Sequence, residues 1–283
     1  LVHGSTGAGN DQVRFDVVLR ATVPGATVAA PIRDEALSRE TTAAWLADRG
    51  LGPLQDDPTL SINTGLWGTT AGGGVTHDPW AAPGPDAFPT TQEPTSAPPA
   101  GVQLVLAFEA GLPVALDGEA LSGVALVEQL ATIAAAVGVG RGIHLGDTIL
   151  GIKGRIAFEA PAATVLLAAH RELEKLVLTA GQRFWKDHLG EVYGQLVHEA
   201  RSLDPLARDI EAMIASSQQR VTGEVRVHLR QGGVQVTGVR SPHSLMAVQD
   251  TAYGEGTSLW TGDQAAGFAR IHGIPSFLAA RVA

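Results

Sequence analysis

The sequence predicts an α/β piece at the front of the chain and a larger α+β piece with antiparallel hairpins behind it. In the front, a strand end, a glycine-rich loop and a helix are followed by a short strand and a second helix, an alternation typical of a parallel sheet. Farther along, pairs of alternating apolar segments flank tight turns, as in hairpins. We expect domain limits of 1–50, 51–262 and 263–283.

The elements of the front piece follow from side-chain spacing and capping residues. Residues 11–22 carry apolar side chains at helical spacing, which predicts a helix with Asn10 or Asp11 as its N-cap. A Pro-Gly pair ends this helix, and the apolar run over 26–32 predicts a short buried strand. Ser38 then opens a second helix that extends to about residue 48.

The main piece begins with a long irregular segment over residues 72–101, which holds three consecutive glycines and seven prolines. Connections of this length in compact domains are usually functional or flexible. The expected elements after it are a hairpin over 102–116, a helix through 126–137, helices near 162–178, 181–200 and 205–219, a hairpin over 225–239 and weak helical character from 263.

Charge and composition exclude several classes of partner. Twenty Lys and Arg residues stand against 29 Asp and Glu, so the net charge of −9 argues against nucleic acid or an anionic membrane as the main partner. The absence of cysteine excludes disulfides, thiolate catalysis and thiolate metal sites, and fits a reducing compartment. With no signal peptide or membrane span in the sequence, we expect a cytoplasmic protein.

The loop over residues 3–10 is the strongest candidate for a ligand site on its residues alone. Its glycines, Gly4 among them, let the backbone approach a ligand closely and turn N–H groups inward. The N-terminus of the helix that follows stabilises a phosphate or a carboxylate. A small anion is therefore one expected ligand.

Polar side chains around this loop suit an amino acid, whose two charged ends need partners of both signs. Thr6 offers a hydroxyl group and Asn10 an amide. Asp11 could hold an ammonium group, and Arg14 could form a bidentate pair with a carboxylate. The alternative is an ordinary glycine-rich turn that Asn10 caps, with Arg14 in solvent.

Several stretches, taken in chain order, carry a resemblance to one family. They are HGSTGAGNDQVRF, SINTGLWG, GIKGRIAFEAPA with AHRELEKLVLT, SQQRVTGEVRVHL and RSPHSLM. In them the chain closely resembles the argininosuccinate synthases from His3 to about Phe268. The resemblance implies ligation of citrulline to aspartate with ATP and Mg²⁺, through a citrullyl-adenylate, with release of AMP and pyrophosphate. It also implies a cytosolic homotetramer built from an adenine-nucleotide alpha-hydrolase-like domain, a synthetase domain and an oligomerisation segment.

The resemblance also implies roles for individual residues. It places Gly4 against ATP, and it assigns Thr6, Asn10 and Asp11 to aspartate. The implied citrulline ligands are Asn10, Arg14, Ser61 and Thr70. For Ser61 and Thr70 the alternative interpretation is a pair of ordinary loop hydroxyls.

The chain departs from the family at two positions near this site. Gly146 stands where many members have a glutamate that binds the citrulline amino group, and Phe158 stands where they have a tyrosine. Asp147 could supply the missing carboxylate, with a hydrogen bond from His144. An aspartate after a glycine is otherwise a routine turn residue.

Two further pairs of residues are weaker candidates. Lys153 and Arg155 could face the phosphates or merely flank a buried strand. His170 and Glu174 lie four apart at helical spacing without a metal-binding signature, so we expect a surface pair.

The pyrophosphate-binding SGGLDTS-like loop of the family does not occur in this sequence. We expect it upstream of Leu1, and we expect the chain by itself to be inactive. No covalent intermediate is needed, so no catalytic nucleophile is predicted. The alternatives are a non-catalytic amino-acid-binding or assembly module, and an adenylating ligase of the same superfamily that acts on another ureido substrate.

Overall fold

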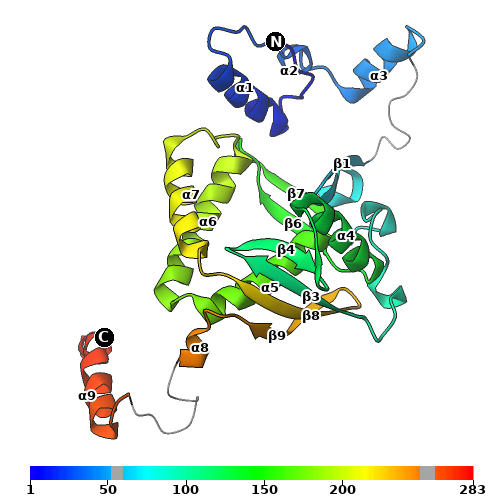
Figure 1. The fold of residues 1–283 in the computed structure, drawn as a ribbon. Helices are drawn as coiled ribbons and strands as arrows, with labels where there is room; N and C mark the ends of the chain where they lie inside the picture. Colours follow the sequence, from blue (N-terminus) through cyan, green and yellow to red (C-terminus); the bar gives the residue numbers. More distant parts are fainter. Residues whose placement is uncertain (52–59, 249–258, 283) are drawn as a thin grey trace. The chain divides into compact units, whose positions relative to one another are not determined.

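The structure, a computed structural model, describes residues 1–51, 60–248 and 259–282 (Figure 1). The chain divides into two compact units, Leu1–His243 and Ser244–Ala283. The predicted domain limit after residue 50 lies next to residues 52–59, which are outside the described part of the chain.

The front of the first unit contains the helices α1 (Asp11–Thr22), α2 (Pro31–Asp34) and α3 (Arg39–Ala47). The predicted helices over 11–22 and 38–48 are confirmed, and the Ser38 hydroxyl accepts a hydrogen bond from the backbone N–H of Thr41. The predicted strand over 26–32 is wrong in extent, because Val2 and Ala29 form only an isolated parallel bridge. Proline at the first position of α2 already starts a helix two residues later.

A four-stranded sheet follows, with strand order β1-β2-β7-β6 and antiparallel neighbours throughout. Its strands are β1 (Ser61–Gly65), β2 (Gly68–Gly72), β6 (Arg141–Asp147) and β7 (Lys153–Glu159). One face of this sheet packs against the irregular segment 73–101, which contains three short 3₁₀ turns. The small core between them consists of Ala71, Ala87 and Ala157 with Phe88.

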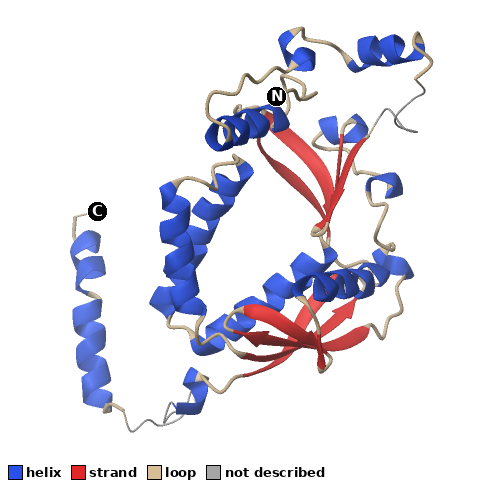
Figure 2. Cartoon of the chain, turned by 45° about the horizontal axis from the view of Figure 1, so that its top comes forward, coloured by secondary structure: helices blue, strands red, loops and turns tan. Residues whose placement is uncertain are grey.

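A second sheet of five strands carries the main core of the protein. Its order is β5-β4-β3-β8-β9, and the helices α4 (Gly123–Ala136) and α5 (Pro161–Val177) pack on it (Figure 2). Leu106, Leu126, Leu130 and Leu173 are fully buried between the strands and these helices. Burying each such side chain contributes roughly 1.5–3 kcal/mol to folding.

Both predicted hairpins in this sheet are confirmed. The first joins β3 (Val102–Glu109) to β4 (Leu112–Leu116), and a short β5 (Glu119–Ala120) adds to its edge. The second joins β8 (Gly223–Arg230) to β9 (Gly233–Arg240) through a two-residue turn, Gln231 and Gly232, with φ of 47° and 81°. Positive φ at both turn residues matches the twist of a tight hairpin, and glycine adopts it without strain.

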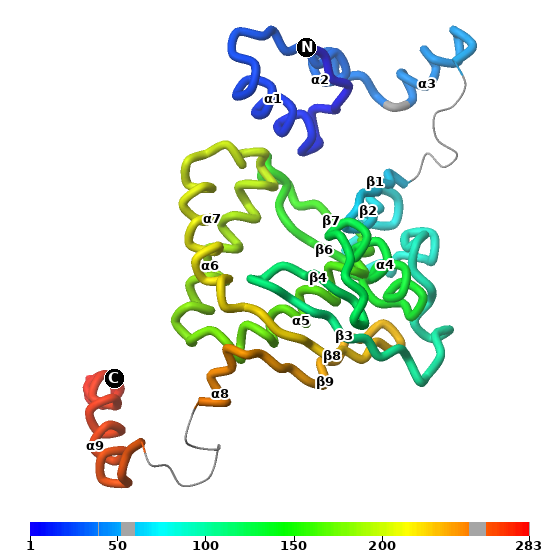
Figure 3. The backbone as a smooth tube through the Cα atoms, in the orientation of Figure 1, coloured from blue at the N-terminus to red at the C-terminus, as the bar shows by residue number. Residues whose placement is uncertain are grey.

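The predicted helices α6 (Ala180–His198) and α7 (Pro205–Gln218) lie side by side as a helical hairpin (Figure 3). Thr179 and Gln182 form a capping box at the start of α6, and Asp204 accepts from the N–H of Leu206 at the start of α7. Leu196 of α6 packs against α7 in a small core of its own.

The expectation that His170 and Glu174 form a surface pair is wrong. The Glu174 side chain is 3% exposed and accepts hydrogen bonds from Gln218 Nε2 at 2.7 Å and Lys186 Nζ at 3.0 Å. Burial lowers the pKa of His170, whose Nε2 lies 3.0 Å from Gln218 Oε1. The pair lies on the side of α5 that carries the buried Leu173, so helical spacing alone did not distinguish inside from outside.

The second unit contains α8 (Leu245–Val248), α9 (Gly262–His272) and α10 (Ile274–Ala280). The predicted helical character after residue 263 is confirmed, and Thr261 and Gln264 form a capping box before α9. Large apolar side chains on α9 and α10, such as Phe268 and Phe277, are exposed. Within the described residues no helix is both long enough and apolar enough to span a membrane.

Candidate functional site

One face of the four-stranded sheet collects the hydroxyls and the two unusual positions that the sequence singled out. Residues directly opposite each other in antiparallel strands project to the same face. Thr70 is opposite Asn63 on one side and Phe158 on the other, and Ser61 is two residues before Asn63. Phe158 is in turn opposite Gly142, so this face, the Ser61–Thr70 face, extends across all four strands.

The Ser61–Thr70 face is polar and lined with glycine toward β6. The Phe158 ring lies against Gly142, where a Cβ atom would collide with it. The His144 ring covers Gly146 in the same way, because a Cβ atom on Gly146 would be 2.5 Å from His144 Nε2. Glycine at these positions therefore makes room for the two rings, and an imidazole occupies the space above the position where relatives were expected to have a glutamate.

Asp147 projects away from the Ser61–Thr70 face, since it is the neighbour of Gly146 on the same strand. It is opposite Lys153, whose Nζ is 2.7 Å from the Asp147 carboxylate. Both side chains are more than half exposed, so this ion pair contributes about 0–1 kcal/mol to stability.

Arg155, on the same opposite face as Lys153, holds the irregular segment. Its guanidinium donates to the backbone carbonyls of Asp78 and Ala81. In this structure the cations of the GIKGR stretch are therefore engaged by Asp147 and by backbone oxygens.

Asn10 fastens the opening loop to the turn between β6 and β7. It is the N-cap residue of α1, as predicted, but its side chain makes no capping hydrogen bond. Instead its Oδ1 accepts from the backbone N–H of Ile149 at 2.8 Å. Because the oxygen of the amide is engaged by a donor, the Nδ2 group is left to donate to a ligand.

Arg14 is fixed by the end of α6. Its Nη1 donates to Asp11 Oδ1 at 3.0 Å, its Nε to the carbonyl oxygen of His198 at 2.8 Å and its Nη2 to His198 Nδ1 at 3.1 Å. The Arg14 side chain is 37% exposed, so it is neither buried nor free in solvent.

Beneath the opening loop lies an ionic cluster that sequence reasoning missed. His3 Nε2 is 3.1 Å from Asp16 Oδ1, and Arg33 reaches the other Asp16 oxygen at 3.3 Å. The hydrogen bond from His3 is the largest cause that lowers the pKa of Asp16, followed by those from Arg20 and Arg33. These residues are up to 30 positions apart, and only a histidine just before the glycine loop hinted at such a cluster.

Gly4 of the opening loop faces open space. No heavy atom lies within 4 Å of the position that a Cβ on Gly4 would take. The Thr6 hydroxyl lies across the loop from Gly9, 3.5 Å from the position of a Cβ atom there. The loop backbone at the start of α1 is therefore accessible to a ligand.

A second group of residues that the sequence did not single out is structural. Glu159 is 1% exposed, and its carboxylate accepts from the backbone N–H and the hydroxyl groups of Thr90 and Thr91. Arg141 donates to the hydroxyl and the carbonyl oxygen of Thr91. This buried carboxylate fastens the irregular segment to β7 and has no capacity left for a ligand.

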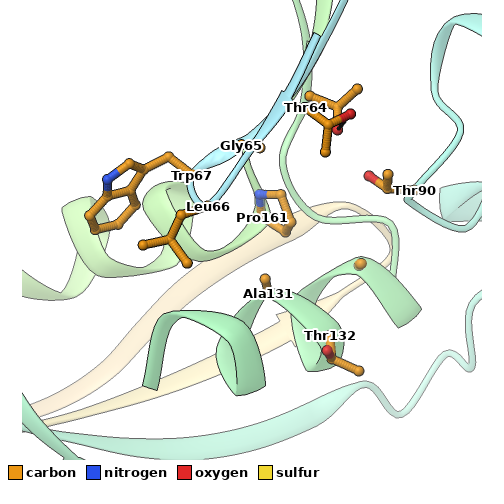
Figure 4. A pocket seen from close by; sticks show the side chains of 11 residues that line it. Thr64, Gly65, Leu66, Trp67, Thr90, Ala131, Thr132 and Pro161 are labelled. Atoms are coloured by element: carbon orange, nitrogen blue, oxygen red, sulfur yellow. Dashed lines mark hydrogen bonds between the residues drawn. The ribbon is translucent and has the colours of Figure 1, made fainter. Parts of the chain in front are cut away.

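A pocket of about 230 Å³ lies between the β1–β2 turn and α4 (Figure 4). Its lining includes Thr64, Leu66, Trp67 and Thr132. The side chains of Thr64 and Thr69 in this lining project to the face opposite Ser61 and Thr70. Among the described residues no group of three or more His, Asp or Glu could hold a metal ion.

Comparisons with known proteins cover the whole chain. Residues 1–52 match the model of the arginosuccinate synthase N-terminal HUP domain, and residues 60–279 match that of the arginosuccinate synthase C-terminal domain. The chain is 41% identical to an argininosuccinate synthase of Xanthomonas campestris pv. campestris, over 100% of this chain and 71% of that protein. It is 40% identical to one of Xylella fastidiosa, over 100% and 70%, and 38% identical to one of Rubrobacter xylanophilus, over 98% and 68%.

Proposed function

The chain belongs to the argininosuccinate synthase family, and from this premise we propose that it binds citrulline and aspartate for their ATP-dependent ligation. The ureido oxygen of citrulline attacks the α-phosphorus of ATP, and pyrophosphate leaves. The aspartate amine then attacks the activated ureido carbon, loses a proton and displaces AMP. The observation that carries the proposal is that family similarity extends over both parts that form the site, the opening loop and the Ser61–Thr70 face.

We place citrulline between Arg14 and the Ser61–Thr70 face. Arg14 has five N–H donors, and three of them are engaged with Asp11 and His198. One N–H on each of Nη1 and Nη2 is left, an arrangement that suits a carboxylate. The hydroxyls of Ser61 and Thr70, on one face of neighbouring strands, suit the polar groups of the same substrate.

We place aspartate at the opening loop, with Thr6, the Asn10 Nδ2 group and Asp11 as its ligands. Asp11 is 65% exposed and bonds Arg14 through one oxygen, so its other oxygen is open to an ammonium group. We place Asn10 between the two substrates. Its Oδ1 accepts a hydrogen bond from the backbone N–H of Ile149 in the β6–β7 turn, and its Nδ2 group can donate to a ligand.

Asp147 enters this proposal only by breaking its ion pair with Lys153 and reaching around the edge of the sheet. β6 is an edge strand and Asp147 is its last residue, so the path to the citrulline ammonium is short. His144, which already lies on the Ser61–Thr70 face, is the better placed polar group.

ATP fits the open side of the opening loop. The free space next to Gly4 admits a ligand, and the N-terminus of α1 favours the charge of a phosphate. Mg²⁺ would arrive bound to the phosphates of ATP, because such ions keep several waters and few protein ligands. The protein's contribution is then positioning and charge neutralisation, which requires no nucleophile of its own.

We also propose a homotetramer in the cytoplasm, as the family resemblance implies. The exposed Phe268 and Phe277 on α9 and α10 support an assembly, because large apolar side chains gain from burial between subunits. Light scattering of the purified protein checks the proposal, and a monomer at micromolar concentration would contradict it.

The activity is tested with the complete gene product that contains this chain. Pyrophosphate release is measured with ATP and citrulline, with and without aspartate, and argininosuccinate is identified by mass. Release with another ureido compound but not with citrulline would support a related ligase instead. Binding of citrulline or aspartate without any release would support the non-catalytic module.

A further inference from the structure

His198 is the last residue of α6, and its carbonyl oxygen is one of the four at a helix end that have no partner within the helix. Arg14, 184 residues earlier in the chain, donates a hydrogen bond from Nε to this oxygen at 2.8 Å. The negative end of the helix dipole also attracts the guanidinium. The backbone of α6 therefore holds Arg14 whatever the residue at position 198.

The side chain of His198 adds a contact that depends on its identity. Arginine is always protonated and can only donate, so His198 Nδ1 accepts the hydrogen bond from Arg14 Nη2 at 3.1 Å. The carbonyl oxygen and Nδ1 of His198 thus both accept hydrogen bonds from the Nε and Nη2 edge of the guanidinium.

The contacts with His198 leave part of the Arg14 guanidinium for a ligand. With Nε and one N–H of Nη2 on His198 and one N–H of Nη1 on Asp11, the remaining N–H groups lie on the two Nη atoms. A guanidinium held on one edge loses less rotamer freedom when a carboxylate binds the other, so the held form binds more tightly.

The other charged groups near His198 are carboxylates and one further arginine. Asp11 on α1 bonds the same guanidinium, and Glu199 follows His198 in the chain. A hydrogen bond from Gln195 and then one from Arg201 lower the pKa of Glu199, so it stays charged.

We propose that His198 is a positioning residue, whose side-chain acceptor orients Arg14 to receive the carboxylate of citrulline. The inference rests on the proposed function, because it assigns to Arg14 the substrate carboxylate. It adds a determinant of citrulline binding that lies outside the residues that touch the substrate.

The test compares three variants of the complete gene product with the wild-type protein by steady-state kinetics at pH 8. His198→Ala removes the acceptor and raises the KM for citrulline about 5- to 20-fold, by the loss of one charge-assisted hydrogen bond. The KM values for ATP and aspartate change less than about twofold, because neither substrate binds the free N–H groups on Nη1 and Nη2 of Arg14.

His198→Asn distinguishes positioning from a merely structural role. Its Oδ1 can take the place of Nδ1 as acceptor, so the KM for citrulline stays within about twofold of the wild-type value. His188→Ala is the matched control, because His188 lies on the same helix and its ring packs against the Trp185 ring. The control leaves the KM for citrulline as in the wild type.

The outcomes separate this inference from the proposed function. If the wild-type protein releases no pyrophosphate with citrulline, the proposed function fails. If the wild-type protein is active but His198→Ala has an unchanged KM for citrulline, or His198→Asn raises that KM about fivefold or more, the inference is overturned. Thermal unfolding of each variant shows whether it is folded, and His198→Asn provides the test even where the alanine variant is unstable.

Discussion

The two sheets of the first unit are built on opposite principles. The five-stranded sheet is covered by α4 and α5 and buries large side chains such as Leu106 and Leu173 completely. The four-stranded sheet buries Ala71, Ala157 and the Glu159 carboxylate on one face and leaves serine, threonine and glycine on the other. The first arrangement supplies stability, and the second supplies a surface on which a polar substrate can lie.

The largest effect, on the free energy of unfolding, is expected from a substitution in the core beside the five-stranded sheet. Leu173→Ala removes a fully buried side chain and lowers the free energy of unfolding by about 2–5 kcal/mol. The control is Leu167→Ala on the same helix, where the side chain is 59% exposed. Chemical denaturation measures both, and equal losses would contradict the assignment of the core.

The next largest effect is expected when the charged side chains that bind the two amino acids are removed. Arg14→Ala should weaken citrulline by about 2–4 kcal/mol, or roughly 30- to 1000-fold, because a substrate carboxylate loses its bidentate partner. Asp11→Ala should weaken aspartate instead and change citrulline less, although Asp11 also bonds Arg14. Separate titrations of the two amino acids measure this, and an equal rise in both Michaelis constants for both variants would mean that the loop is a scaffold.

The hydroxyls of the Ser61–Thr70 face give a smaller effect. Ser61→Ala and Thr70→Val should each raise the KM for citrulline about 3- to 10-fold, the value of one neutral hydrogen bond. Thr64→Val is the control, since Thr64 lies on the neighbouring position of β1 and projects to the opposite face. If Thr64→Val had the same effect as the other two, the assignment of faces would be wrong.

The smallest effect is expected at Asp147. Asp147→Asn breaks an exposed ion pair with Lys153, so stability changes by less than about 1 kcal/mol. Because this side chain projects away from the Ser61–Thr70 face, the KM for citrulline should change less than about twofold. A tenfold rise would instead make Asp147 the carboxylate that binds the citrulline ammonium.

The sequence predicted what local rules determine. Ser38 and Asp204 began helices where their side chains could cap them, and Gln231 with Gly232 formed a tight turn between alternating strands. The hairpins β1–β2 and β6–β7 were not predicted. The strands β1 and β2 are short and polar, and glycines at positions 142, 146 and 154 interrupt the pattern of β6 and β7.

What the sequence could not provide was contact over long separations. The hydrogen bonds from Arg14 to His198 and from Ile149 to Asn10 join positions more than 130 residues apart. The burial of Glu174 and Glu159 likewise depends on donors supplied by other elements, namely Lys186 with Gln218 and the Thr90–Thr91 pair. Residue types near the site were therefore predictable, whereas the partners that orient them were not.

Hydrogen–deuterium exchange of the complete gene product with and without citrulline tests the division between the two sheets most directly. We expect citrulline to slow exchange in the opening loop, in β1 and β2 and at the β6–β7 turn, and to leave β3 and β8 unchanged. Slower exchange confined to the pocket beside α4, or spread evenly over both sheets, would contradict the assignment of the substrate to the Ser61–Thr70 face.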